Sequence, residues 1–230
     1  MNIARALKPT ALLTALATCL LFSGCFSIVE KVEFDSMNSG TFTMITDLSG
    51  MYEIMATMGQ EEEDPAETEK EFQDMENDMQ EIFPRLQEID GVSNPRTSHD
   101  TEKYTARISF DFNSIDALNQ GMSVLYSKQL ELEEIKQNTY FISKRKSIER
   151  TNARDMIDFL LKDMQDENSA ETMQFFAEAS FDLEYSFPKK IKRVSNKDYN
   201  FEKKSKSVSY QYYMFKPDFE EKPIGAVVKF

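Results

Sequence analysis

The amino-acid sequence predicts an α+β fold, with helices packed on one face of an antiparallel β-sheet. Apolar and polar residues alternate with a period of two near both ends of the 230-residue chain, which is typical of strands with one buried face. Between these ends, apolar residues recur every three or four positions, as they do on the buried side of a helix. Because strands and helices do not alternate regularly, an antiparallel sheet fits the pattern better than a parallel doubly wound sheet.

The first elements of the predicted domain are an N-terminal β-hairpin and a short helix. Residues 29–34 and 42–48 alternate in hydrophobicity and flank the turn-forming residues 37–40, so they are expected to pair as a hairpin. Asp47 or Ser49 can cap the helix that follows, because a side-chain oxygen of either residue can accept a hydrogen bond from a free backbone N–H of the first turn.

The middle of the chain is predicted to contain two helices separated by a connection and a strand. The first helix starts near residue 66 and bends or breaks at Pro84, since proline cannot donate the helical hydrogen bond. Residues 91–100 are rich in turn-forming types and are expected to form a turn-rich connection. Residues 104–112 then alternate as a strand, and Ser114 is expected to cap the second helix.

The remaining sequence is predicted to add one strand, two short helices and a C-terminal β-meander. The strand is expected at residues 140–146 and the helices at 154–164 and 170–179. No linker rich in Gly, Ser or Pro divides residues 25–230, so all these elements are expected to form one domain. Strict alternation predicts the strands of the meander at residues 181–187, 208–214 and 224–230.

The first 24 residues have the composition of a secretory signal peptide. Arg5 and Lys8 precede an uncharged, mostly apolar stretch at 10–22, which is too short to cross a hydrocarbon core of about 30 Å. The next residues complete the sequence Leu21-Phe22-Ser23-Gly24-Cys25. This segment resembles the lipobox of bacterial lipoproteins, in which small residues precede a cysteine that becomes acylated.

The lipobox resemblance implies that residues 1–24 are removed and that residues 25–230 are a single lipid-anchored domain. Cys25 is then expected to carry a diacylglyceryl group and an N-linked acyl chain, which together attach the protein stably to a membrane. In lipoproteins of Gram-negative bacteria, Asp directly after the cysteine favours retention in the inner membrane. Phe26 stands there instead, which implies the outer membrane, and the lack of an acidic run after Cys25 favours its periplasmic face.

Two further stretches resemble known lipoproteins. Uncharacterised α+β lipoproteins that are common in Bacteroidota contain segments similar to Phe34-Asp35-Ser36-Met37-Asn38-Ser39-Gly40-Thr41 and Tyr185-Ser186-Phe187-Pro188-Lys189-Lys190-Ile191-Lys192. More distantly, the order of elements resembles the mycobacterial LppM-type domain, which also begins with a hairpin behind a lipobox and ends in a β segment. These families bring no catalytic residues, so the resemblance implies only a fold and a location in the envelope.

The sequence does not predict an enzyme, a cofactor or a metal site. The single imidazole, His99, lies in a polar stretch that is expected to be a surface turn. The seven glycines form no phosphate-binding loop, and one histidine with no cysteine after Cys25 argues against zinc. The acidic run at 61–64 lacks the spacing of a calcium loop and is expected to be solvated. An enzyme that uses paired carboxylates remains a third interpretation.

Charge is unevenly distributed along the chain, which has a formal net charge of −13. This acidic balance argues against a nucleic acid as the partner. Acidic residues predominate between positions 53 and 90, whereas basic residues predominate between 189 and 206. The basic segment is expected either to be a passive solvated surface or to orient the protein toward anionic headgroups. The candidate membrane-orienting residues are Lys189, Lys190, Lys192, Arg193, Lys203, Lys204 and Lys206.

Two interpretations of function follow from these patterns. The first is a membrane-anchored, non-enzymatic binding module of the cell envelope, whose partner is an envelope protein or another envelope component. The alternative is a carrier or sensor of an apolar ligand or lipid in a groove lined by Met and Phe, because flexible thioethers can repack around such a ligand. A closed hydrophobic core would produce the same pattern of Met and Phe in the sequence, so the pattern does not distinguish a core from a groove. The residues concerned are Met51, Met55, Met58, Met75, Met79, Phe175, Phe176 and Tyr212.

Overall fold

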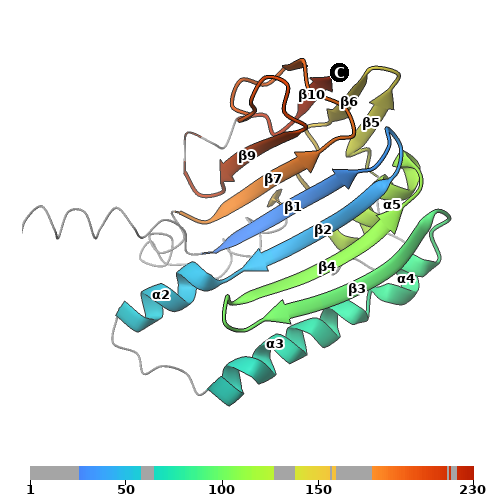
Figure 1. Ribbon diagram of the computed structural model, residues 1–230. Coiled ribbons are helices and arrows are strands. Elements are labelled where there is room, and N and C mark those ends of the chain that lie inside the picture. Colours follow the sequence, from blue (N-terminus) through green and yellow to red (C-terminus); the bar gives the residue numbers. More distant parts are fainter. Residues whose placement is uncertain are drawn as a thin grey trace, which may run out of the picture.

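The protein contains two β-sheets and several helices, which confirms the predicted α+β class (Figure 1). The computed structural model describes residues 26–57, 65–126, 138–155, 157–158, 178–216, 218 and 222–230. The six-stranded sheet has the strand order β3 (Val92–Asp100), β4 (Thr105–Phe112), β2 (Gly40–Asp47), β1 (Ser27–Phe34), β7 (Ser180–Ser186) and β9 (Ser207–Tyr213). The four-stranded sheet has the order β5 (Phe141–Lys144), β6 (Ser147–Arg150), β10 (Ala226–Lys229) and β8 (Arg193–Val194).

The predicted N-terminal hairpin is formed by β1 and β2 at the centre of the larger sheet. The two strands pair antiparallel from Phe34 opposite Gly40 to Ser27 opposite Asp47. Gly40 is needed at the turn, since a Cβ there would lie 2.0 Å from the carbonyl oxygen of Glu33. Alternate residues of β1 face the core, as period-two alternation predicts.

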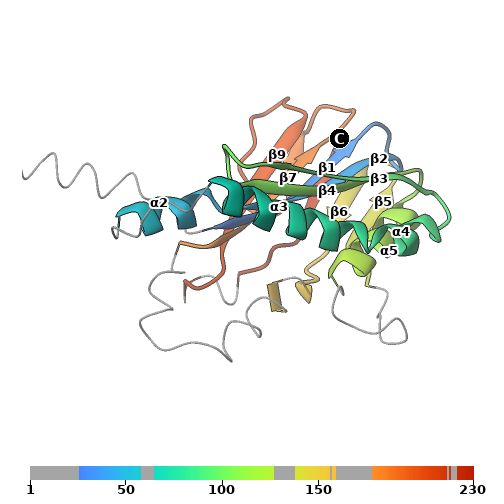
Figure 2. The same ribbon diagram turned by 90° about the horizontal axis from the view of Figure 1, so that it is seen from below.

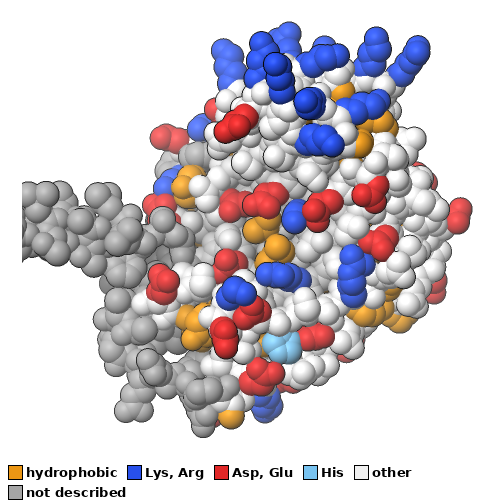
Figure 3. Space-filling view, viewed as in Figure 1, with side chains coloured by type: hydrophobic (Ala, Val, Ile, Leu, Met, Phe, Trp, Pro, Cys, Tyr) orange, Lys and Arg blue, Asp and Glu red, His pale blue; other side chains and the backbone are white. Residues whose placement is uncertain are grey.

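The helices α3 (Pro65–Gln80), α4 (Phe83–Gln87) and α5 (Ile115–Tyr126) cover one face of the six-stranded sheet, as predicted (Figure 2). The four-stranded sheet packs on the same face, so the core lies between the larger sheet and these elements (Figure 2). The described elements leave the opposite face of the larger sheet uncovered, and this face carries mostly polar side chains (Figure 3).

The helix boundaries follow the local signals of the sequence. The backbone N–H of Ser49, the first residue of α2 (Ser49–Thr57), donates to Asp47 Oδ1 at 2.9 Å. At the start of α5, the N–H of Ala117 donates to Ser114 Oγ at 3.0 Å. Both predicted caps are therefore present. The predicted break at Pro84 is also confirmed, because α3 ends at Gln80 and Pro84 lies in the first turn of α4.

Two features of the predicted sheet are different in the structure. β1 and β7 pair in parallel, so the larger sheet is mixed rather than wholly antiparallel. The C-terminal strands do not form one continuous meander, because β7 and β9 join the larger sheet whereas β10 pairs with β6 and β8 in the smaller one. Alternation shows which side chains are buried, but it does not encode the direction or the partner of a strand.

The expectation of a turn-rich connection at residues 91–100 was wrong, because most of this segment is strand β3. β3 lies at the edge of the larger sheet, and its register with β4 shifts between Ser93 and Arg96. Within this irregularity, Asn94 has a φ of 51° and precedes Pro95. An edge strand tolerates proline and a bulge because one side of its backbone needs no partner strand.

Several predicted elements fall wholly or mostly outside the described residues. These are the lipobox with Cys25, the acidic run at 61–64, and the short helices at 154–164 and 170–179. The predicted strand at 140–146 is present as β5, and the strand at 104–112 as β4.

Aromatic side chains join the two sheets into one core. Phe34 at the end of β1 stacks on Phe187 with ring centroids 5.4 Å apart, and it meets Phe141 of β5 edge-on at 5.8 Å. Phe187 in turn contacts Phe230, which follows β10, at 5.1 Å. Offset or edge-on aromatic pairs of this kind add to the free energy gained by burying their apolar surface.

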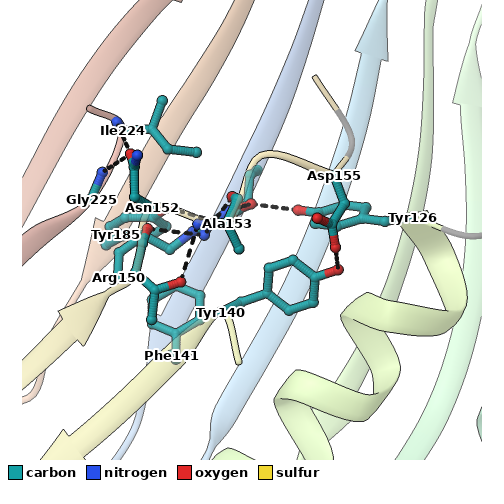
Figure 4. Close-up of polar contacts among 12 residues, drawn as sticks. Tyr126, Tyr140, Phe141, Arg150, Asn152, Ala153, Asp155, Tyr185, Ile224 and Gly225 are labelled. Carbon is teal, nitrogen blue, oxygen red and sulfur yellow. Dashed lines mark hydrogen bonds and ion pairs between the residues drawn. The ribbon is translucent and has the colours of Figure 1, made fainter. Parts of the chain in front are cut away.

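A fully buried ion pair links the two sheets inside this core. Glu30 of β1 is 0% exposed and Arg150 of β6 is 3% exposed. Arg150 Nε donates to Glu30 Oε1 at 2.9 Å and Nη2 donates to Oε2 at 2.8 Å, so the contact is bidentate. Its remaining guanidinium nitrogen, Nη1, donates to the backbone carbonyl of Ala153 at 3.2 Å. Figure 4 shows the side chains of Tyr126 and Tyr185 reaching toward Arg150.

The two tyrosines complete the hydrogen bonds of the buried carboxylate. Tyr185 Oη donates to Glu30 Oε1 at 2.5 Å, and the hydroxyl of Tyr126 donates to Oε2. Burial, reinforced by the nearby Glu30 carboxylate, raises the pKa of both tyrosines well above 10, so both hydroxyls keep their protons. Burial alone would lower the pKa of Arg150, but the Glu30 carboxylate raises it, and the guanidinium stays charged.

Arg150→Met should lower the free energy of unfolding by about 3–5 kcal/mol, because it leaves the Glu30 carboxylate buried without its cation. Glu30→Gln combined with Arg150→Met should recover part of this loss, since the neutral amide carries no charge, and its oxygen accepts from one tyrosine while its NH2 group donates to the hydroxyl oxygen of the other. Urea unfolding measures both effects. Arg145→Met, in the exposed turn between β5 and β6, is the matched control and should change little. A loss below about 1 kcal/mol in Arg150→Met would contradict the role assigned to the pair.

A second polar cluster fastens α3 to the edge of the larger sheet. His99 of β3 lies between two carboxylates of α3, with Nδ1 2.5 Å from Glu76 Oε2 and Nε2 3.2 Å from Glu69 Oε1. Thr97 Oγ1 also donates to Glu76, at 2.9 Å. The hydrogen bonds to Glu76 and then Glu69 raise the pKa of His99 above 6.5, and the hydrogen bond from His99 lowers the pKa of Glu76.

His99→Gln should therefore destabilise the protein in a pH-dependent way. Because the folded-state pKa of His99 is raised, its stabilising effect is complete below pH 6.5 and disappears as the pH rises through the folded-state pKa. The substitution should cost up to about 1 kcal/mol at pH 5.5 and less at pH 9. Unfolding curves of both proteins at the two pH values measure the difference, and an equal cost at both would show that the charge of His99 contributes nothing.

Candidate functional site

Basic side chains gather at one end of the molecule, which we call the basic end. Figure 3 shows Lys and Arg side chains grouped along the upper end of the molecule, over β10 and the β5–β6 turn. All of them are exposed. The basic end consists of Lys144, Arg145, Lys146, Lys189, Lys190, Lys192, Arg193, Lys203, Lys204, Lys206 and Lys229.

The register of the four-stranded sheet assembles one part of the basic end. Lys144 and Lys229 both pair with Ser147, from opposite sides, and Lys229 also pairs with Arg193 of β8. The backbone N–H of Lys192 donates to the carbonyl of Lys229 at 2.9 Å. Basic residues from three separate segments of the chain therefore lie in a row across the end of this sheet.

The connection between β7 and β9 supplies the remaining residues of the basic end. It folds back on itself through backbone hydrogen bonds, from Ile191 N–H to Ser205 at 2.8 Å and from Phe187 N–H to Lys206 at 2.8 Å. Phe187 and Ile191 are buried, whereas the lysines between and beyond them point outward. The apolar residues fix this connection on the core, and the polar ones remain available to a partner.

Lys204 has an unusual backbone conformation within the basic end. Its φ is 74°, in the left-handed region that favours glycine or asparagine, and its N–H donates to the carbonyl of Ile191 at 3.3 Å. A residue with a long side chain pays about 1 kcal/mol for this conformation. A lysine therefore occupies a position where the backbone by itself favours a smaller residue.

The basic end keeps a surplus of positive charge. Lys144 Nζ binds Glu149 Oε2 at 3.2 Å, and within the described ranges the structure shows no ion pair for the other members. The β7–β9 connection also contains two acidic residues, Asp198 and Glu202, fewer than its lysines and arginine. A surface of this kind attracts anions, since each unpaired cation adds to the local positive potential.

The basic end lies at the opposite end of β1 from the point where the chain enters the domain. Ser27 at the start of β1 pairs with Ser180, and Phe26 accepts from the N–H of Ser180 at 3.2 Å. At the other end, Glu33 pairs with Ser186, just before the basic connection begins. With a rise of about 3.3 Å per residue, these two register positions are about 20 Å apart.

An open groove of about 790 Å³ borders the basic end on the uncovered face of the larger sheet. Its floor is formed by β1, β7 and β9, and the β7–β9 connection forms one wall. The groove is lined by Lys31, Glu33, Glu184, Tyr185, Ser186, Asn200, Phe201, Glu202, Ser205, Ser207, Val208 and Ser209.

A smaller hollow of about 170 Å³ lies near the start of β1, lined in part by Phe26, Asp47, Ser180 and Asp182. Burial raises the pKa of Asp182, and Glu184 and Asp47 add to this effect. In the part of the chain that the structure describes, no group of three or more His, Cys, Asp or Glu side chains is placed to hold a metal ion.

The structure brings the seven predicted membrane-orienting residues together at the basic end. Four further members, Lys144, Arg145, Lys146 and Lys229, were not predicted, although the Lys-Arg-Lys run between two strand-like stretches is a local signal for an exposed basic turn. Cys25 lies outside the described residues. None of the described helices combines the length and the apolar composition needed to span a bilayer.

The predicted Met/Phe groove is only partly described. Tyr212 is fully buried and its hydroxyl oxygen accepts from Arg154 Nη2 at 2.7 Å, so it belongs to the core. Met79 is buried and Met75 packs against the core. Phe175 and Phe176 lie outside the described residues, as do the side chains of Met55 and Met58.

Comparison with known proteins gives one similar solved structure. No protein-family model matches the chain, and no curated protein matches it. The NMR structure of the folded domain of the Mycobacterium tuberculosis LppM protein is similar, with a TM-score of 0.41 and 10% sequence identity. The match covers 90% of this chain and 91% of the LppM chain.

Proposed function

We propose that this chain is a membrane-anchored lipoprotein of the cell envelope, and that its folded domain is a non-enzymatic interaction module. Its binding surface is the basic end, and its partner is an acidic component of the envelope. The observation that carries this proposal is the gathering of exposed lysines and arginines from the β5–β6 turn, β8, β10 and the β7–β9 connection at one end of an otherwise acidic chain.

The physical basis of binding is electrostatic attraction. Near an anionic surface each exposed Lys or Arg contributes about 1 kcal/mol, so a group of this size can bind without a deep pocket. The attraction acts over about 10 Å at 0.1 M salt and weakens as salt is added. The glycine-favouring backbone of Lys204 supports a role for its side chain, because the chain tolerates local strain to keep a cation there.

The position of the anchor supports a partner away from the anchoring membrane. Cys25 directly precedes Phe26, which already contacts the start of β7, so the proposed lipid has no flexible spacer. The basic end begins about 20 Å further along β1, beyond the reach of the headgroup charge when the strands stand upright on the bilayer. Attachment to the outer membrane, facing the periplasm, is part of this proposal and rests on the lipobox segment and Phe26.

The alternative function, a carrier of an apolar ligand or lipid, has less support. The open groove and the smaller hollow are lined mostly by polar side chains, and the described methionines and Tyr212 pack in or against the core.

Cys25→Ala should abolish acylation and release the protein from the membrane fraction, because the proposed anchor depends on this one thiol. Incorporation of labelled palmitate and fractionation of cells measure the two effects. Cys19→Ala is the matched control, since this second cysteine lies in the proposed signal peptide. This substitution should change neither palmitate incorporation nor recovery in the membrane fraction. Membrane recovery of Cys25→Ala at an undiminished yield would refute the anchor.

Replacement of Lys189, Lys190, Lys192 and Arg193 by Gln should weaken binding of poly-L-glutamate at low salt by at least about tenfold, because each lost cation removes a share of the attraction. The acylated protein in phosphatidylcholine nanodiscs is titrated at 20 and 300 mM salt, and the difference should shrink at the higher concentration. The control replaces four exposed basic residues elsewhere by Gln, namely Lys70, Arg96, Lys103 and Arg107. Equal weakening in both variants would assign binding to net charge alone.

The same titration in nanodiscs that contain phosphatidylglycerol tests the orientation. If the basic end faces away from the anchoring bilayer, anionic lipid should leave poly-L-glutamate binding at 150 mM salt nearly unchanged. Loss of binding would show instead that the basic end is occupied by the headgroups of its own membrane.

A further inference from the structure

The groove beside the basic end has a size and a position suited to a small ligand. Its volume of about 790 Å³ is within the range of ligand sites, about 300–1,000 Å³. Strands β1, β7 and β9 give it a rigid floor, and the β7–β9 connection is fixed beside it by two backbone hydrogen bonds between Asn200 and Ser209, at 2.7 and 3.0 Å. The groove is therefore present without any rearrangement of the chain.

The groove contains an exposed aromatic ring. Phe201 is 38% exposed and is the large hydrophobic residue that stands out from the surface among those the structure describes. Exposure of a phenyl ring to water is unfavourable, and the free energy falls when an apolar surface covers the ring. Its electron-rich face attracts C–H groups, which carry a small positive charge.

The rest of the groove is lined by polar groups that can both donate and accept hydrogen bonds. Glu184 offers a carboxylate, Asn200 an amide, and Ser207 and Ser209 offer hydroxyl groups. Lys31 and Glu33, which form an ion pair at 3.2 Å, border the same space. A sugar ring has the complementary chemistry, because its faces carry C–H groups and its rim carries hydroxyls.

The groove and the basic end share one segment of chain. Phe201, Glu202 and Ser205 line the groove, and Lys203, Lys204 and Lys206 of the same segment belong to the basic end. A polymer whose sugar ring lies on Phe201 therefore has its neighbouring units beside these lysines. Acidic groups on those units would be attracted to the lysines, away from the carboxylates of the groove.

We propose that the groove is a saccharide-binding site, and that the acidic partner of the basic end is a chain of sugars that carries carboxylate groups. One sugar residue stacks on Phe201 and bonds through its hydroxyls to Glu184, Asn200 and the neighbouring serines. The acidic groups of adjacent residues contact Lys203, Lys204 and Lys206. This assignment rests on the proposed function, because it identifies the partner that the basic end attracts.

The experiment compares two polyanions of equal charge, of which only one contains sugar. The acylated protein in phosphatidylcholine nanodiscs is titrated with an oligogalacturonate and with poly-L-glutamate at low salt. The wild-type protein should bind the oligogalacturonate about tenfold more tightly, because stacking adds to the charge attraction. Phe201→Leu should remove this preference and leave poly-L-glutamate binding unchanged, whereas Phe201→Trp should keep it. Urea midpoints equal to the wild type show that both variants are folded.

The outcomes separate the two proposals. Equal affinity of the wild type for both polyanions, or a preference that survives Phe201→Leu, overturns the saccharide site and leaves the basic end in place. Absence of binding to poly-L-glutamate overturns the basic end as an anion-binding surface. A triple variant should bind both polyanions at least about tenfold more weakly, because charge contributes to the affinity for each of them. This variant combines Lys203→Gln, Lys204→Gln and Lys206→Gln.

Discussion

The buried contact between Glu30 and Arg150 is the constraint on which the arrangement of this protein depends. Glu30 lies at the centre of the six-stranded sheet and Arg150 at the end of β6 in the four-stranded sheet, so neither charge can be satisfied unless the two sheets dock in one register. A buried ion pair adds little net stability compared with an apolar pair, but an unpaired charge in the same place is very costly. The pair therefore fixes the relative position of the two sheets and contributes less to the stability of their contact.

The assembly of the basic end follows from that docking. Its residues come from the four-stranded sheet and from the connection between β7 and β9, and Lys229 and Arg193 become neighbours only when β8 and β10 pair. Phe187 and Ile191 fasten the connection to the common core, while the lysines of that connection stay in water. One side of the connection thus stabilises the fold, and the other exposes positive charge beside the open groove.

Local signals determined a large part of the secondary structure. The sequence also indicates that one charged residue, Glu30, is buried. The hairpin, both caps and the break at Pro84 depend on residues close together in the chain, so their physical causes can be read directly. Glu30 is in phase with the inward-facing Ile28 and Val32, a pattern that signals a buried carboxylate in need of a cation. Which arginine supplies it, 120 positions away, is not a local property.

The sequence by itself determined the fold class, the inward face of most strands and the basic character of residues 189–206, and the proposal of an anchor at Cys25 rests on the sequence alone. Only the tertiary structure decided that β1 and β7 run parallel, that β10 leaves for the second sheet, and that residues 91–100 extend as an edge strand. It also decided that Lys144 and Lys229 join the basic end beside Phe201. The physical reason is that alternation and capping act over a few residues, whereas strand partners and shared surfaces depend on contacts between distant segments.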